Sequence, residues 1–336
     1  MTRQMLSGVA TTVGALMLCL ASLTAIAAPA LAPHETDTRF SQLLNAPPTV
    51  VHFVDETGRL RAPFIYPWRR VNQLEQRYEP DRGLAIPLAW FAGGHIIQSS
   101  DEARAPLLLL GADSFGRDVF SRLLFGARMS LGLSLLAAFA AMCVGAVVGG
   151  VAGYLGGGTD EVLMRGSEFI LVLPAMYVAL ALRSVMPLVL TAEDVFVLLL
   201  AIFAILGAPS ISRGVRAIVR AERHLDYAVA ATSLGAGHAR VLVRHLLPAA
   251  RGFLVVQLTM LIPAFIVAEA TLSYVGLGFP EPVASWGTML QDASNLRAIG
   301  DFPWLLSPAA AMFLVVLAVN LVLQRGPVFQ GDERRP

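Results

Sequence analysis

The residue types that carry most enzyme chemistry are missing or scattered in this chain. All 25 basic residues counted as Lys or Arg are arginine, which excludes a P-loop lysine and a Schiff-base lysine. Cys19 and Cys143 lie in apolar runs, and the six histidines do not have the spacing of metal ligands. We therefore expect no catalytic residues, no metal site and no bound cofactor, and we do not expect an enzyme.

Two carboxylates lie within or at the ends of apolar segments. Glu168 and Glu269 each occupy such a position. An ionisable side chain inside a membrane is costly unless it is paired or hydrated, so these residues are candidates for a translocation path. The alternative is that both lie near helix ends, where water and lipid headgroups reach them.

The segment 226–248 offers a surface for docking. It is polar, flanked by arginines and placed between two strongly apolar stretches. Its pattern predicts a helix, a break at Gly235, a second helix and a stop at Pro248. Small residues let a partner approach closely, and Arg240 and Arg244, one turn apart, can pair with acidic groups. The residues expected to form the docking surface are Tyr227, Ala230, Ala231, Gly235, Arg240, Leu247 and Pro248.

The composition predicts that membrane-spanning helices position these residues. The chain is 56% hydrophobic and 15% charged, with a mean hydropathy of +0.64, whereas soluble domains carry about 25% charge. We expect an all-α membrane protein with six transmembrane helices. The apolar stretches are 4–33, 129–159, about 164–187, about 195–212, 252–275 and about 303–323.

The first apolar stretch has a second interpretation. It resembles a signal peptide, because Arg3 precedes it and Ala-Pro-Ala-Leu-Ala lies near 28–32. We expect residues 1–33 to be an uncleaved transmembrane anchor, since the stretch is long and more spans follow.

The regions between the spans differ in character. Residues 34–112 are polar and Pro-rich, and we expect an extracytoplasmic insertion with a β-hairpin over 49–66. Residues 113–325 form the transmembrane domain, and 326–336 are a short tail. Within the second span, glycines recur every four residues and predict close helix packing: Gly145, Gly149, Gly153 and Gly157. Trp286 and Trp304 are expected to be aromatic anchors at the outer interface.

Arginine placement predicts the orientation. The loop 213–251 holds seven arginines and is expected to be cytoplasmic. Counting spans from there places both termini in the cytoplasm and residues 34–128 outside.

Four ordered motifs resemble one family. The spacing of Ala230, Ala231, Gly235, Leu247 and Pro248 resembles the EAA loop of ABC importer permeases, with Val229 at the position of the motif's Glu. Three more segments are similar to permeases of the dipeptide/oligopeptide (DppC/OppC) type: Leu110–Arg128, Gly153–Arg165, and Glu269–Pro280 followed by Ser285-Trp-Gly287. The resemblance covers about residues 110–325.

This resemblance implies the partners and the mechanism. It implies a permease subunit of a binding-protein-dependent importer in a bacterial inner membrane, with the type I permease core. The expected partners are a second, B-type permease subunit, two ATPase subunits, an extracytoplasmic substrate-binding protein and membrane lipid, with no nucleic acid. The substrate, a peptide, a nickel chelate or another solute, stays open.

Two other classes of function are weighed against this one. An ion-gradient-driven secondary carrier would favour ionisable residues at mid-membrane and inverted repeats, and neither is clear. A secreted or membrane-bound enzyme would need a convergent catalytic set, which is not visible.

Overall fold

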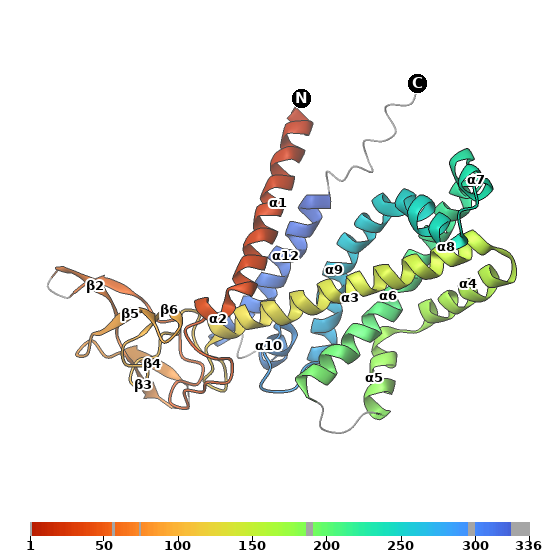
Figure 1. The fold of residues 1–336 in the computed structure, drawn as a ribbon. Coiled ribbons are helices and arrows are strands. Elements are labelled where there is room, and N and C mark those ends of the chain that lie inside the picture. The colour runs from red at the N-terminus through yellow and green to blue at the C-terminus, as the bar shows by residue number, and fades with distance from the viewer. Residues whose placement is uncertain (1, 56–57, 74, 186–190, 295–299, 324–336) are drawn as a thin grey trace. The chain divides into compact units, whose positions relative to one another are not determined.

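The computed structural model describes residues 2–55, 58–73, 75–185, 191–294 and 300–323 (Figure 1). Most of them are helical. Within these ranges, five helical stretches are long and apolar enough to cross a membrane: Gly8–Ile26, Val119–Leu155, Ala192–Glu222, His238–Tyr274 and Pro303–Leu323. They agree with five of the six expected spans. The expected tail 326–336 lies outside the described residues.

The remaining expected span, about 164–187, is the third along the chain and is not confirmed as a single helix. The chain forms α4 (Gly157–Val172) and α5 (Ala175–Val185), with an extended residue, Leu173, at the end of α4. Pro174 follows, and a proline disfavours the helical conformation of the residue before it. Each of the two helices is too short to cross a bilayer without the other.

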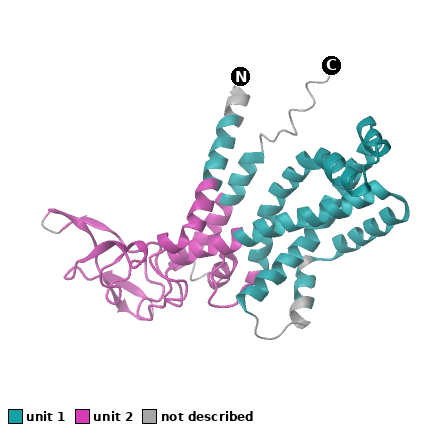
Figure 2. Ribbon diagram, in the orientation of Figure 1, with its two compact units in different colours: residues 1–18, 132–272, 315–336 teal, residues 19–131, 273–314 magenta. Residues whose placement is uncertain are grey.

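The chain divides into two compact units, shown in teal and magenta in Figure 2. Unit 1 comprises residues 1–18, 132–272 and 315–336, and unit 2 comprises residues 19–131 and 273–314. The long helices α1 (Thr2–Ile26), α3 (Val119–Leu155) and α9 (Arg251–Tyr274) each contribute to both units.

In unit 1, glycines of α3 let its backbone lie against α6 (Ala192–Glu222). A Cβ on Gly145 would lie 2.7 Å from the carbonyl oxygen of Ala208, and one on Gly153 would lie 2.6 Å from that of Arg216. A Cβ on Gly149 would overlap with the carbonyl group of Ser212. The expected glycine face is confirmed at these three positions. Gly157, at φ +55°, instead begins α4 and has open space around it.

Unit 2 contains the β structure. Strands β1 (His52–Val54), β2 (Leu60–Ile65), β5 (Ile86–Ala92) and β6 (His95–Ser99) form an antiparallel sheet in that order. Strands β3 (Trp68–Asn72) and β4 (Arg77–Pro80) form a separate antiparallel pair.

The hairpin expected over 49–66 is confirmed. His52 pairs with Phe64 and Val54 with Leu60, and the amide of Gly58 donates to the carbonyl oxygen of Asp55 at 3.0 Å. A buried apolar cluster packs within this region and contains Ile65, Ile86, Leu88, Ala105 and Leu107.

The beginning of α3 is fixed within unit 2. Asp118 caps the helix by accepting from the amides of Phe120 and Ser121, each at 3.1 Å. His34, which follows the short helix α2 (Ala28–Leu31), has its Nδ1 3.3 Å from the same carboxylate. Apolar residues of α2 pack on the first turns of α3 around Leu124.

Candidate docking site

The candidate site lies in unit 1, between α6 and α9. The chain leaves α6 at Glu222 and forms α7 (Asp226–Ser233). It then continues through α8 (His238–Arg240), the π-helical turn η1 (Val241–Leu246) and the 3-10 turn η2 (Leu247–Ala250) directly into α9. Residues 213–222, expected in the loop, belong to the end of α6, so the segment between the two long helices is shorter than the expected loop.

The expected stop at Pro248 is wrong. Helical structure runs without interruption from His238 to Tyr274. Pro248 lies in the first positions of the 3-10 turn η2, where its missing N–H does not have to donate. The wider π-helical turn before it adjusts the backbone, so the proline shapes the entry into α9 and does not end a helix.

Gly235 ends α7 in a Schellman motif, as the expected glycine break requires. Its φ is +82°, a left-handed conformation that side chains disfavour. Its amide donates to the carbonyl oxygen of Thr232 at 3.0 Å, and the amide of Ala236 donates to that of Ala231 at 3.1 Å. These two hydrogen bonds define the motif. A Cβ on Gly235 would meet open space, so its constraint is conformational and not steric.

The base of this hairpin is fastened to the end of α3. The Nη1 of Arg223 donates to the carbonyl oxygens of Gly153 at 3.1 Å and Tyr154 at 2.9 Å. A cation here also complements the negative end of the α3 dipole. The hydroxyl of Tyr154 lies 2.8 Å from His238 Nδ1. The segment before α7 and the start of α8 are therefore both held by one helix of the same unit.

Helix α7 presents apolar side chains to the outside. Its one buried residue is Ala228, and the exposed large apolar or aromatic residues on and around it are Leu225, Tyr227, Val229 and Leu234. The side chain of Leu234 is 89% exposed. Val229, at the position of the motif's Glu, is also exposed. Exposed apolar side chains outside the spanning helices are candidates for contact with another protein.

Tyr227 is held in place on this surface. Its hydroxyl donates to Glu222 Oε2 at 2.6 Å. Local burial, this hydrogen bond and the negative charge of Glu222 raise the pKa of Tyr227 to about 12. The phenol therefore stays protonated, and the hydrogen bond persists at physiological pH.

The other expected docking residues all lie within this helical hairpin, in α7, α8 and η2, but not all of their side chains are exposed. Ala230 and Arg240 are exposed, and Ala231 is half-buried. Leu247 is half-buried because its side chain lies over Gly150 of α3, at 3.3 Å from a Cβ placed there. Pro248 is exposed and shapes the turn. Leu247 therefore anchors the hairpin and does not contribute to its outer surface.

Helix α4 is joined to α6 just before the hairpin. The guanidinium of Arg216 forms a two-point contact with the Asp160 carboxylate, through Nε to Oδ1 and through Nη2 to Oδ2, the latter at 2.5 Å. Arg220 Nη1 lies 3.6 Å from the same carboxylate. Two-point Arg–carboxylate pairs have a fixed geometry, so a movement of the hairpin end of α6 carries α4 with it.

The two candidate path residues have different environments. Glu168 is exposed on α4, whereas Glu269 is completely buried in α9. Buried charged groups in membrane proteins are paired or neutral. Of the two, only Glu269 is a buried ionisable side chain, and it therefore stays the stronger candidate for a translocation path.

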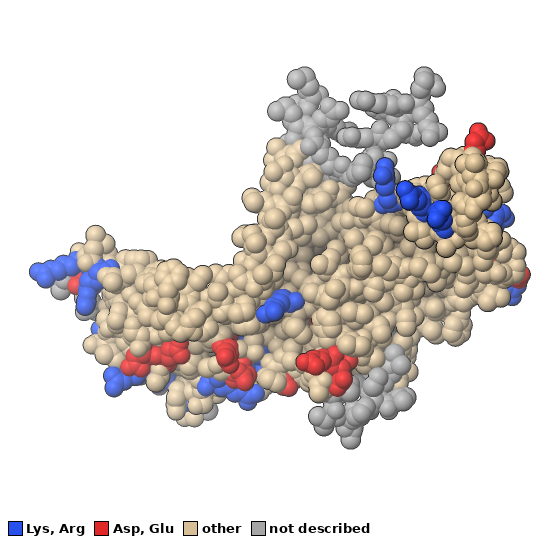
Figure 3. Space-filling model, in the orientation of Figure 1, with Lys and Arg blue, Asp and Glu red and all other residues tan. Residues whose placement is uncertain are grey.

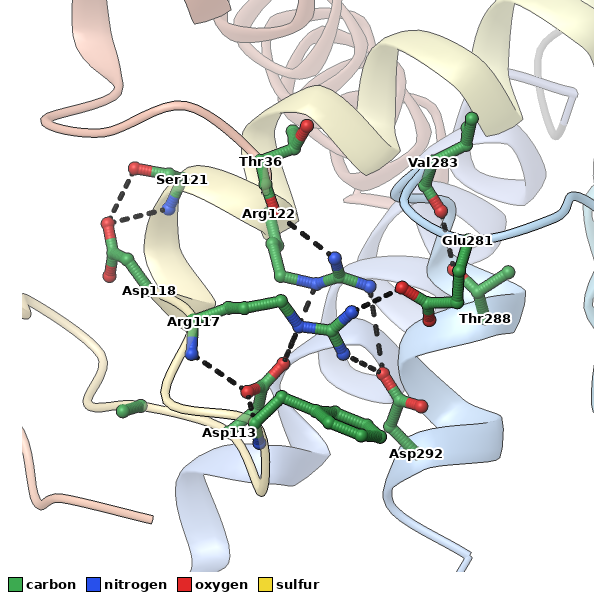
Figure 4. Close-up of polar contacts among 12 residues, drawn as sticks. Thr36, Asp113, Arg117, Asp118, Ser121, Arg122, Glu281, Val283, Thr288 and Asp292 are labelled. Carbon is green, nitrogen blue, oxygen red and sulfur yellow. Dashed lines mark hydrogen bonds and ion pairs between the residues drawn. The ribbon is translucent and has the colours of Figure 1, made fainter. Parts of the chain in front are cut away.

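In unit 2, the motif Leu110–Arg128 meets the segment 281–292 at a buried arginine, shown in Figure 4. Arg117 is fully buried and contacts three carboxylates: Asp113 at 2.6 Å, Glu281 at 2.5 Å and Asp292 at 2.6 Å. Burial opposes its charge, but the three carboxylates outweigh this effect and raise the pKa of Arg117. The segment 113–118 forms a turn in which the Asp113 carboxylate accepts hydrogen bonds from the amides of Phe115 and Arg117.

A second arginine borders the same group of carboxylates. Arg122 is 1% exposed, with Nη2 3.6 Å from Asp292. Asp292 ends α10 (Trp286–Asp292), and burial raises its pKa although both arginines favour its charge. These residues join the segment before α3 to the segment after α9.

Trp286 is not an interfacial anchor, contrary to the expectation. It is 2% exposed, and its indole Nε1 donates to the carbonyl oxygen of Leu123 at 3.1 Å. Its position in the Ser-Trp-Gly motif serves packing against α3, because the α3 residue Gly126 leaves room for the ring. Trp304 is half-buried and donates to the carbonyl oxygen of Ala112 at 3.0 Å.

The sequence reasoning missed the residues that fasten the hairpin. Tyr154 and His238 are 84 positions apart, and Arg223 reaches carbonyl groups 69 and 70 positions earlier. Such contacts leave no periodic signal. In the sequence, Arg223 is one of seven arginines in 213–251 that indicate orientation, and its type does not reveal these partners.

The described residues define a helical membrane protein that spans the bilayer several times and carries a folded helical hairpin between two spans. Comparisons with known proteins identify its class. Residues 141–326 match the family described as "Binding-protein-dependent transport system inner membrane component". The chain belongs to this family.

Two relatives indicate the branch of the family. The chain is 36% identical over 213 residues to the oligopeptide transport system permease protein OppC of Bacillus subtilis, which covers 63% of this chain and 67% of that protein. It is 31% identical over 262 residues to the dipeptide transport system permease protein DppC of Haemophilus influenzae, which covers 78% and 81%. The chain is a DppC/OppC-type permease, and an ion-gradient-driven carrier is not favoured.

The sequence matches cover only part of each relative, and a match to a solved structure extends over part of this chain. The chain spans about two thirds of the length of the first relatives, with 67% of OppC and 64% of DppC of B. subtilis. A solved structure described as an amino acid ABC transporter with histidines covers 61% of this chain and 92% of its own, with a TM-score of 0.43 and 18% identity. The family assignment rests on the sequence matches.

Proposed function

We propose that this chain forms half of the translocation pathway of an ATP-driven importer and couples to ATPase subunits through the hairpin 223–250. The observation that carries the proposal is the apolar outer surface of α7, which lies between two spanning helices and includes Leu234 with 89% of its side chain exposed. In a chain of this family, a partner subunit is the natural cover for such a surface.

The hairpin has the properties of a mechanical connection. Arg223 and His238 fix its base to α3, and the pair Asp160–Arg216 joins α4 to α6. When ATP binding closes two ATPase subunits, a hairpin seated in them moves as a rigid element. The spanning helices attached to it then rock between inward-open and outward-open states. This chain makes and breaks no bond; ATP hydrolysis belongs to the ATPase chains.

The complete importer would contain further subunits. We propose a B-type permease as the second half of the pathway, two ATPase subunits at the cytoplasmic face and an extracytoplasmic protein that delivers substrate. The relatives named as oligopeptide, dipeptide and glutathione permeases support peptides as the substrate class. The arginines of 213–251 support a cytoplasmic hairpin, cytoplasmic termini and an outer location for 34–112.

Co-purification of the ATPase subunits tests the proposal. Leu234→Asp places a charge in the centre of the proposed interface and should release the ATPase subunits from the co-expressed complex. Leu60→Asp is the matched control, because Leu60 is an equally exposed leucine, 84%, in the β region. Equal retention of ATPase subunits by the two variants would contradict a coupling role for the hairpin.

A further inference from the structure

The β5–β6 hairpin of unit 2 differs from the rest of the β region in charge. Between Arg82 and Asp101 the sequence has no Asp, Glu, Lys or Arg. The β1–β2 hairpin, by contrast, carries Asp55, Arg59 and Arg61. An uncharged surface hairpin in an otherwise charged region is unusual for a protein that faces only water.

The tip of this hairpin exposes two large aromatic side chains. Trp90 and Phe91 lie in the last positions of β5 before Ala92, and the side chain of Phe91 is 81% exposed. Gly93 and Gly94 form the turn with φ values of +60° and +89°, which matches the primed turns of tight hairpins. Phe91 itself has a φ of +52°, which costs about 1 kcal/mol for a side chain of this kind. Packing inside unit 2 does not explain an exposed aromatic residue in this conformation.

The hairpin is attached beside a membrane-spanning helix. Strand β6 packs against α2, and α2 follows α1 after one residue. Leu20, Leu23 and Ile26 form an exposed apolar stripe on the last turns of α1, as expected of a helix that faces lipid. Figure 3 shows that the flank of the β region beside α1 lacks charged side chains, whereas they gather along the opposite margin and at the far tip.

We propose that the β5–β6 hairpin lies in the bilayer interface, with Trp90 and Phe91 placed among lipid headgroups and the adjoining acyl chains. Trp is enriched at this depth because its ring is apolar and its N–H remains hydrated. The apolar surface of the hairpin continues the lipid-facing surface of α1. Covalent attachment to α1 supplies a high local concentration of membrane, so a small apolar area suffices for stable contact.

This assignment gives the insertion 34–112 a role that does not depend on substrate or ATP. The hairpin holds one edge of the β region at the membrane surface. The charged β1–β2 hairpin is not part of this contact and extends into water.

Fluorescence in lipid nanodiscs tests the proposal on the full chain. Cys19 and Cys143 are replaced by Ala, and an environment-sensitive fluorophore is attached to Phe91→Cys or, as the matched control, to Leu60→Cys; both positions are highly exposed within the protein. The label at position 91 should show blue-shifted emission and should be quenched by phosphatidylcholine that is brominated on its acyl chains. The label at position 60 should show neither effect.

Intrinsic fluorescence gives an independent reading without a label. The chain has four tryptophans, and the variant Trp90→Phe should lose a component that brominated lipid quenches in the parent chain. If neither position 91 nor Trp90 is quenched by brominated lipid, the proposal is overturned. Protection of position 91 that requires the substrate-binding protein would assign the hairpin to that partner and would also overturn the proposal.

Discussion

The guanidinium of Arg216 donates two hydrogen bonds to the carboxylate of Asp160, which joins α4 to the end of α6. The pair lies two helical turns before the hairpin begins, and Asp160 is only 10% exposed. Together with Arg220, whose Nη1 lies 3.6 Å from the same carboxylate, this pair links α4 by charge to the helix that leads into the proposed coupling element.

Removing this pair should destabilise the subunit. Asp160→Asn leaves Arg216 without its charged partner and should cost about 1–3 kcal/mol, the range for hydrogen bonds to charged groups. Thermal unfolding of the purified subunit in detergent measures the change. Glu161→Gln is the control, because the Glu161–Arg165 pair is mostly exposed and should contribute little. Equal effects of the two substitutions would contradict a structural role for Asp160.

The glycine face of α3 should tolerate no side chain at its centre. In Gly149→Ala the new methyl group would overlap with the carbonyl group of Ser212, and α3 and α6 would have to separate. We expect a lower unfolding temperature and a lower yield of folded subunit. In Gly132→Ala, on the same helix, the methyl group meets open space, and a small gain of about 0.5–1 kcal/mol is expected. A stable Gly149→Ala variant would contradict the close approach.

The buried carboxylates of unit 2 should make stability depend on pH. Burial raises the pKa of Asp292 above its ordinary value of 3.8. The native state therefore binds more protons than the unfolded state in the window between 3.8 and the raised value. The stability that Asp292 contributes is present below this window and is lost as pH rises through the native pKa.

Substitution isolates this effect. The difference in unfolding temperature between the parent chain and Asp292→Asn should decrease as the pH rises above 3.8, because the variant lacks the titrating group. Asp101→Asn is the control, because the pair Asp101–Arg104 is largely exposed. Identical pH profiles of the parent chain and Asp292→Asn would contradict the proposed burial cost.

Local patterns predicted much of the fold. Five spans were found because hydropathy over 20 residues depends on composition alone. The hairpin over 49–66 was found because alternating residues flank the turn residues Asp55–Gly58. The α3 glycine face was found because a period of four places Gly145, Gly149 and Gly153 on one side of a helix. In each of these cases the signal lies within a short segment.

Contacts between distant segments could not be predicted in this way. Arg117 binds carboxylates 164 and 175 positions later, and the charge of an arginine does not indicate its partner. The effect of a proline on a helix could not be predicted from its position in the sequence either. Pro174 follows the end of α4 whereas Pro248 lies at the start of a turn and is accommodated, and the difference depends on the backbone around each residue. Trp286 was expected at the interface because its residue type indicates amphipathic placement but not burial.

The proposed orientation predicts the side of the membrane from which each extramembrane segment can be labelled. A cysteine at position 58, in a chain otherwise free of cysteine, should react with a membrane-impermeant maleimide from the outer side. A cysteine at position 234 should react only after the cytoplasmic side is opened. Both are placed at exposed turns. Reaction of position 58 from the cytoplasm alone would reverse the orientation.

The coupling account depends most directly on Gly235, whose φ of +82° maintains the end of α7. Gly235→Leu should strain this turn, whereas Gly235→Asn should be tolerated because Asn adopts the left-handed conformation more readily. Gly237→Leu is the steric control, since Gly237 is exposed with an ordinary φ of −64° and open space around it. All three chains should insert, because positions 235 and 237 lie between the two long apolar helical stretches, Ala192–Glu222 and His238–Tyr274.

The decisive measurement is substrate uptake into proteoliposomes that contain the complete importer, together with the amount of ATPase subunit retained. The account predicts that Gly235→Leu loses ATPase subunits or hydrolyses ATP without uptake, while Gly235→Asn and Gly237→Leu retain most of both activities. Full uptake and normal retention of ATPase subunits by Gly235→Leu would show that this hairpin does not couple ATP hydrolysis to transport.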